Sequence, residues 1–355
     1  MKDVKNTAAG RLVLLACAGF ALVLGLRAAL GLAGIIAVQP LDHGALMVFG
    51  FLGTAISLER AVAARVTWGW IAPIAAAVAS VTLAAQLAIV AGICWVLSFS
   101  ALVGIYIHIQ RRAATIAVQV QMIGAVAGVL AVAQWMLNTS FASALPMAAC
   151  FAIATIIGER IELARVSFAG ANAEGRIAWS VMALFSAAVV AIAHPAGNAL
   201  FGLALGGVGA AALRVDVARK LIRSQGVSRY MAACMLAAYV WLILAALVWV
   251  IGGSYDVRVH AIFLGFVMSM IFAHAPTIAT AVSKRTLPYH RVLYIPVILL
   301  HVGLSARVLG SLIGDLLAWR IAGVSNVVAV AVFMICAVTL SVWKGKRSAI
   351  ANTRR

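Results

Sequence analysis

Twelve apolar segments follow one another along this chain, and each is long enough to cross a lipid bilayer. A helix crosses the hydrocarbon core with about 20 residues. Of the 355 residues 65% are hydrophobic and 10% are charged, whereas soluble domains carry about 25% charged residues. We therefore expect an all-α polytopic membrane protein with a single transmembrane domain over residues 1–355. The expected spans are residues 11–38, 43–62, 67–85, 87–110, 114–136, 141–163, 176–194, 197–218, 229–252, 258–283, 290–312 and 317–343.

The basic residues indicate membrane orientation and argue against nucleic-acid binding. The formal net charge is +18, and 23 of the 27 Lys and Arg residues fall in the two tails and in every second expected loop. Membrane proteins show this bias because positively charged loops stay in the cytoplasm. We therefore predict a bacterial-type inner (cytoplasmic) membrane protein with both termini in the cytoplasm and an uncleaved first helix. The five cysteines all fall inside spans without CxxC spacing, so they predict neither a disulfide framework nor a thiolate metal site.

Three segments of the chain align with one another and suggest an internal repeat. They are 51–59 (FLGTAISLE), 151–159 (FAIATIIGE) and 266–274 (FVMSMIFAH), and each places a phenylalanine eight residues before an ionisable group. They fall in the second, sixth and tenth expected spans. This spacing predicts three four-helix units, at about 11–110, 114–218 and 229–343. Because the three spans run in the same direction, their ionisable groups should gather at one depth near the cytoplasmic side.

Two histidines open similar apolar helices and carry the main functional hypothesis. His43 begins the segment HGALMVFGF, and His260 begins the segment HAIFLGFVMSM. Imidazole is costly to place in a membrane, so its presence there predicts a functional site. We expect both side chains near the extracytoplasmic side, facing one cofactor. Gly44, Gly50 and Gly265 would let a flat macrocycle approach the backbone, although small residues also serve helix packing.

These residues resemble the catalytic subunit of the heme–copper oxidases. His43, Met47, Val48 and Phe49 resemble the signature of its second helix, and residues 259–267 (VHAIFLGFV) look like the tenth helix of its cbb3-type and nitric-oxide-reductase branches. The histidines of those two helices are the axial ligands of a low-spin heme. The chain is also similar to the NnrS family, twelve-helix proteins linked to nitric oxide metabolism, in the MVFGF run at 47–51 and in the later His-Ala pair.

The resemblance implies a heme b held by His43 and His260, with a role in electron transfer or in handling nitric oxide or oxygen. It also implies a redox partner, either a protein or a quinone, and leaves room for copper. The chain departs from both families, however. The sixth span has no histidine, the seventh has only His194, and Asp42 stands where the NnrS pattern has a further histidine. The residues of a reducing centre are therefore not identified, and oxidoreductase activity does not follow.

Four further ionisable groups outside the histidine pair have two interpretations each. Arg27 and Arg307 fall within the outer parts of their spans, where each would bind a heme propionate or extend to the interface. His301 falls near the middle of the eleventh span, either as a metal ligand or as a hydrogen-bonded packing or proton-handling residue. His274 belongs to the third copy of the repeat and has the same metal or proton-relay alternatives as the carboxylates Glu59 and Glu159.

The carboxylates Glu59 and Glu159 also have a structural interpretation, because each precedes an arginine. Ion pairs at the cytoplasmic boundary would fix the ends of their helices. A rival function from another class is a secondary transporter whose intramembrane polar residues bind a substrate or an ion. Only the prolines at 276 and 296 suggest the broken helices that such transporters use. A structural or sensory membrane subunit is the third alternative.

Overall fold

The computed structural model describes residues 8–39, 41–163, 172–283 and 287–353, and the side chains of 278–283 and 343–353 are not described. The described residues form helices and connecting loops without strands, and 12 helices are long and apolar enough to span a membrane. The predicted all-α polytopic fold is therefore confirmed. Three residues counted in the basic loops, Arg165, Lys284 and Arg285, lie outside the described residues.

Nine spans consist mainly of one helix each. Their main helices are α1 (Ala8–Leu32), α4 (Ile71–Ala84), α5 (Ala88–Arg112), α6 (Ile116–Asn138), α7 (Phe141–Leu163), α8 (Ala173–Ala193), α9 (Gly197–Val215), α11 (Gly226–Val250) and α15 (Leu316–Thr353). A 3₁₀ turn, Thr67–Trp70, precedes α4, and the short helix α10 (Ala218–Leu221) lies in the loop after α9. The eleventh span joins the turn Arg291–Leu293 to α14 (Tyr294–Ile313).

The second and tenth spans are each interrupted by a π-helical segment. The second runs through α2 (His43–Ala45), the π-helix η2 (Leu46–Leu52) and α3 (Gly53–Ala64). The tenth runs through α12 (Tyr255–His260), the π-helix η4 (Ala261–Met268) and α13 (Ser269–Ser283). π-Helical turns are rare and frequently occur at functional sites. η2 begins three residues after His43, which opens the second span, and η4 begins directly after His260. The tenth span itself begins at Tyr255, so His260 does not open it as the sequence predicts.

The first span ends six residues earlier than the sequence predicts, because glycine terminates α1. Gly34 takes a left-handed backbone with φ of 71°, and the amide of Ile35 donates to the carbonyl of Leu30 at 3.0 Å. This is a Schellman-type end, in which glycine adopts positive φ without a steric cost. The chain from Gly34 to the next helix is therefore free to cross toward His43.

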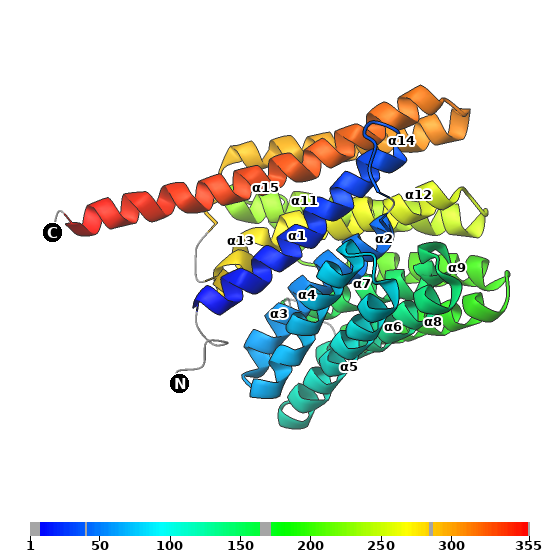
Figure 1. The fold of residues 1–355 in the computed structure, drawn as a ribbon, viewed down its shortest axis with the longest axis horizontal. Coiled ribbons are helices and arrows are strands. Elements are labelled where there is room, and N and C mark those ends of the chain that lie inside the picture. The colour runs from blue at the N-terminus through cyan, green and yellow to red at the C-terminus, as the bar shows by residue number, and fades with distance from the viewer. Residues whose placement is uncertain (1–7, 40, 164–171, 284–286, 354–355) are drawn as a thin grey trace.

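The second, sixth and tenth spans form the centre of the bundle. Buried residues make up 72%, 89% and 67% of them, compared with at most 56% of any other span. The sixth span, α7, packs closely against α6. A Cβ added to Gly158 of α7 would lie only 2.9 Å from the carbonyl oxygen of Ala117 in α6. In Figure 1, α1 begins and α15 ends at the same end of the bundle, as an even number of spans requires. The division into three repeat units stays a prediction.

Candidate functional site

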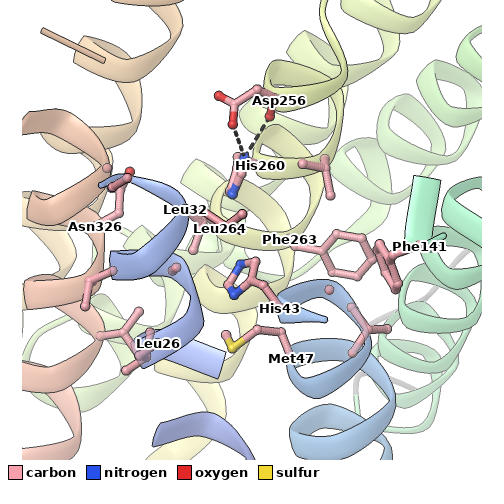
Figure 2. Close-up of a pocket in the computed structure, with 18 of the residues that line it drawn as sticks. Leu26, Leu32, His43, Met47, Phe141, Asp256, His260, Phe263, Leu264 and Asn326 are labelled. Carbon is pink, nitrogen blue, oxygen red and sulfur yellow. Dashed lines mark hydrogen bonds and ion pairs between the residues drawn. The ribbon is translucent and has the colours of Figure 1, made fainter. Parts of the chain in front are cut away.

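His43 and His260 lie side by side, although 217 positions separate them in the sequence (260 minus 43). Their ring centres are 6.5 Å apart, and the ring planes differ by 24°. Figure 2 shows the ring of His260 above that of His43, with Met47 below them. The expectation that these side chains face one common space is therefore met by the geometry.

Both imidazole rings have their Nδ1 atom hydrogen-bonded to a backbone carbonyl. Nδ1 of His43 lies 2.8 Å from the oxygen of Gly25, and Nδ1 of His260 lies 2.8 Å from the oxygen of Asp256. A carbonyl can only accept, so each ring must carry its proton on Nδ1. The lone pair of each Nε2 is then free, and neither Nε2 has a hydrogen-bond partner among the described residues. Metal-binding histidines are held by such a second contact.

The space around the rings is a cavity of about 580 Å³, which we call the histidine cavity. Such a volume lies within the range of about 300–1,000 Å³ that is usual for cofactor sites. Most of its lining comes from α1, the second span, the tenth span and α15, and the start of α7 and Arg307 of α14 complete it. Figure 2 shows Phe141 and Phe263 to one side and Leu26 and Asn326 on the opposite side. The lining is mostly apolar, as a site for a flat hydrophobic ring requires.

One end of the histidine cavity carries a charged network around Asp256. Nε and Nη2 of Arg307 donate to the two carboxylate oxygens at 2.9 and 2.6 Å. Trp319 donates from Nε1 to the same carboxylate at 2.9 Å, and the guanidinium group lies over its ring at 5.0 Å. The carboxylate also lies 3.2 Å from Nδ1 of His260. Sequence reasoning did not identify Asp256 or Trp319.

Arg307 reaches the cavity, whereas Arg27 does not. Nη1 of Arg307 has no hydrogen-bond partner among the described side chains, so it is available to an anionic group in the cavity. Arg27 is exposed on α1 and is absent from the cavity lining, although its neighbour Leu26 contributes to it. Successive residues of a helix point about 100° apart, since one turn takes 3.6 residues. The structure therefore does not bring Arg27 to the site.

The three glycines serve helix packing. A Cβ on Gly44 would lie 2.4 Å from the ring of Phe141, and a Cβ on Gly265 would lie 2.5 Å from the ring of Trp241. At Gly50 it would meet Ser80 and Ala21 at 3.0 and 3.1 Å. Only Gly44 of the three lines the histidine cavity. Close approach of helices, and not of a macrocycle, accounts for Gly50 and Gly265.

His301 is held in a hydrogen-bonded packing position. Trp241 donates from Nε1 to its Nδ1 at 2.9 Å, and the hydroxyl of Ser269 lies 3.5 Å from its Nε2. Nδ1 therefore acts as an acceptor, and the proton lies on Nε2. His301 does not line the histidine cavity. These contacts match the packing alternative and leave no lone pair directed at a metal.

The carboxylates of the repeat gather around Arg60 at the opposite end of the second span. Nη2 of Arg60 lies 2.8 Å from Glu59 and 3.5 Å from Glu159, and Nη1 lies 3.1 Å from Glu162. Gln121 donates to Glu162 at 3.2 Å. These contacts match the ion-pair alternative for Glu59 and Glu159.

The second arginine of the repeat joins three spans. Arg160 makes two hydrogen bonds to Asp216, at 2.9 and 3.0 Å, and its Nη1 lies 3.1 Å from Nε2 of His274. Tyr239 donates to the same carboxylate at 2.7 Å. Burial alone would raise the pKa of Asp216, but the hydrogen bonds from Arg160 and Tyr239 outweigh it and hold that pKa below its ordinary value.

Glu59, Glu159 and His274 do line one cavity together, of about 360 Å³, which we call the carboxylate cavity. Their predicted meeting at one depth is therefore seen in the structure. Among the described residues, no group of three or more His, Cys, Asp or Glu side chains is arranged to hold a metal ion. The hypothesis of a divalent metal at these residues gains no support from this arrangement.

The π-helices and the network of Asp256 and Arg307 are the parts of the site that sequence reasoning missed. The similar Gly-Phe pairs at 50–51 and 265–266 are the one signal that both segments share. A family model described as "Domain of unknown function (DUF8744)" matches residues 11–342. No curated protein and no solved structure matches the chain.

Proposed function

We propose that this chain, which belongs to the family described as DUF8744, binds one b-type heme in the histidine cavity and uses it for electron transfer or for handling a diatomic gas. His43 and His260 would supply the two axial nitrogens. Six-coordinate heme with two histidines is suited to electron transfer because it changes little between oxidation states. The proposal includes a bacterial inner membrane with both chain ends in the cytoplasm, which the charge distribution favours.

The observation that carries the proposal is the spacing of the two rings. Imidazole nitrogen binds a transition metal at about 2.0–2.1 Å, and adding about 1.1 Å from each nitrogen to its ring centre gives about 6.3 Å between two axial rings. The observed separation of 6.5 Å between His43 and His260 agrees with this value. Ordinary ring pairs in proteins span about 4.5–7 Å between centres, so the spacing supports the proposal together with the free Nε2 atoms and the cavity around the rings.

The remaining features of the cavity fit a heme as well. Both Nε2 lone pairs are free, and both rings are held through Nδ1, which keeps the ligands ready for the metal. An unengaged guanidinium nitrogen of Arg307 would bind a propionate carboxylate, since arginine is suited to such pairing. The apolar lining excludes water from the rest of the ring. When bound, the heme would supply a reversible one-electron couple.

A visible spectrum of the purified protein tests the proposal. We expect a Soret band with sharp α and β bands on reduction, together with one iron per chain. His43→Ala and His260→Ala should each lose these bands, whereas His194→Ala should keep them because His194 lies in an exposed loop. Added imidazole should restore the spectrum of His43→Gly, which separates ligand loss from misfolding. Colourless wild-type protein from heme-replete cells would contradict the proposal and favour a transporter.

Copper bound between the two imidazoles is the second candidate, because the same ring spacing suits a linear metal ion. Copper also prefers imidazole and thioether ligands, and Met47 lies beside His43 in the cavity. The cavity volume of about 580 Å³ favours the larger cofactor. Metal analysis separates the two, since copper without iron and without a Soret band would replace the heme.

A further inference from the structure

The carboxylate cavity lies directly beside the histidine cavity. Phe51, Leu52 and Ile271 line both, so a layer of these side chains separates the two spaces. Because the two cavities are adjacent and the second one contains two carboxylates, we propose that the carboxylate cavity binds a membrane-dissolved quinol. The quinol would reduce a heme in the histidine cavity and release its protons to Glu59 and Glu159. The electron-transfer step rests on the proposed function, whereas the binding site does not.

The cavity opens toward the lipid-facing surface between α1 and α15. Its lining includes Leu15, Val338 and Val342, whose exposed fractions are 39%, 58% and 43%. Apart from Glu59, Glu159, His274 and Ser341, the rest of the wall is apolar, with Met270 and Phe333 among its buried members. A water-soluble substrate would have to cross lipid to reach this opening. An apolar ring with a long hydrocarbon tail is already dissolved there.

Apart from the hydroxyl of Ser341, which can donate or accept, the polar side chains of the cavity are carboxylates with free acceptor oxygens or an imidazole that is already hydrogen-bonded. Oε1 of Glu59 and Oε1 of Glu159 lie 2.8 and 3.5 Å from Nη2 of Arg60, and their second oxygens have no partner among the described residues. His274 has both ring nitrogens engaged, by Met270 and by Arg160. The two free carboxylate oxygens suit a ligand that donates, and a quinol carries two hydroxyl groups that donate well to carboxylates.

The cluster also provides a route by which protons leave. Arg60 links Glu159 to Glu162, and the side chain of Glu162 is 50% exposed. Oxidation of one quinol breaks two O–H bonds and releases two protons and two electrons. The protons pass to the two cavity carboxylates and then to Glu162 and water. The two electrons would pass one at a time to ferric heme held by His43 and His260, so one quinol would reduce two heme equivalents and become the quinone.

Binding is tested without heme, in the His43→Ala variant. Equilibrium dialysis with duroquinol, kept reduced under anaerobic conditions, should show about one site per chain, and Ala337→Trp should abolish it, because Ala337 lines this cavity and not the other. Glu174→Gln, outside both cavities, is the matched control and should bind as before. Equal binding in Ala337→Trp, or no binding at all, would overturn the proposal. The proposal would also be overturned if the cavity holds an aminophospholipid instead, so that Ala337→Trp releases this lipid from the purified protein.

Electron transfer is tested by mixing duroquinol with the oxidised, heme-loaded protein. Glu59→Gln and Glu159→Gln should each slow heme reduction at least tenfold, while reduction by dithionite and the spectrum stay unchanged. Reduction of the double variant at the wild-type rate would contradict the role of the carboxylates. If the protein binds duroquinol but holds no heme, the proposed function fails and the binding site stands. If the protein holds heme but does not bind duroquinol, the binding site fails and the proposed function stands.

Discussion

His260 and Asp256 are linked twice, through the backbone oxygen at 2.8 Å and through the carboxylate at 3.2 Å from the same ring nitrogen. His43 has only the first kind of contact, with the carbonyl of Gly25. A carboxylate beside the N–H of a metal ligand makes the imidazole more basic and favours the higher oxidation state of the metal. The two axial positions of the proposed heme are therefore electronically different.

The first prediction concerns this carboxylate. Asp256→Asn should raise the midpoint potential of the heme by tens of millivolts, on the scale of the 59 mV that a tenfold change gives for one electron. A spectroelectrochemical titration measures the shift. Asp42→Asn is the control, because Asp42 lines the same cavity but bonds to Trp135 and caps α2. An equal shift in both variants would show that the effect is general electrostatics.

The second prediction separates packing from metal binding at His301. His301→Gln should leave the iron content and the visible spectrum unchanged, because both ring nitrogens already face Trp241 and Ser269. It should reduce the free energy of unfolding by roughly 1–3 kcal/mol, and so lower the thermal midpoint, since the buried indole N–H of Trp241 loses its acceptor. A changed Soret band in this variant would assign His301 to the metal site.

The third prediction concerns the ion pair of Arg160 and Asp216. Arg160→Ala or Asp216→Ala should destabilise the protein by about 3–5 kcal/mol, because each leaves a buried charge without its partner. Detergent unfolding followed by circular dichroism measures this loss. Arg27→Ala is the control, and it should change stability by less than about 0.5 kcal/mol because the residue is exposed. A comparable loss in the control would refute the argument from burial.

The fourth prediction is the pH dependence of the same pair. Because the folded state lowers the pKa of Asp216, the ionised group stabilises the fold above its unfolded value of about 3.9. That contribution should decrease as the pH falls through the folded pKa. The stability difference between wild type and Asp216→Asn should therefore be constant from pH 7 to 5 and decrease below about pH 4. A difference that grows on acidification would have the wrong sign.

The fifth prediction concerns the close contact of α6 and α7. Gly158→Leu should destabilise or prevent folding, by 1–3 kcal/mol or more, since its Cβ would lie 2.9 Å from the backbone oxygen of Ala117. Gly207→Leu, on α9, should be tolerated because no atom lies within 4 Å of the added Cβ. Yield of monodisperse protein and the unfolding midpoint compare the two variants. Equal yields and unfolding midpoints for the two variants would contradict the prediction, because they would mean that α6 can shift to accommodate the leucine without loss of stability.

The sequence alone determined the number and order of the spans, because a bilayer demands about 20 apolar residues for each crossing. It also singled out His43 and His260, since an imidazole at the start of an apolar helix stands out against its neighbours. The alignment of Glu59, Glu159 and His274 placed these residues at one depth, and they line one cavity in the structure.

Which side chains meet was decided only by the tertiary structure. The phase of α1 turns Arg27 away from the cavity, and Arg307 reaches Asp256 only because α14 packs beside α12. Hydropathy carries no information on such phases, since nearly every face of these helices is apolar. Composition specified the helices, and packing in three dimensions specified the site.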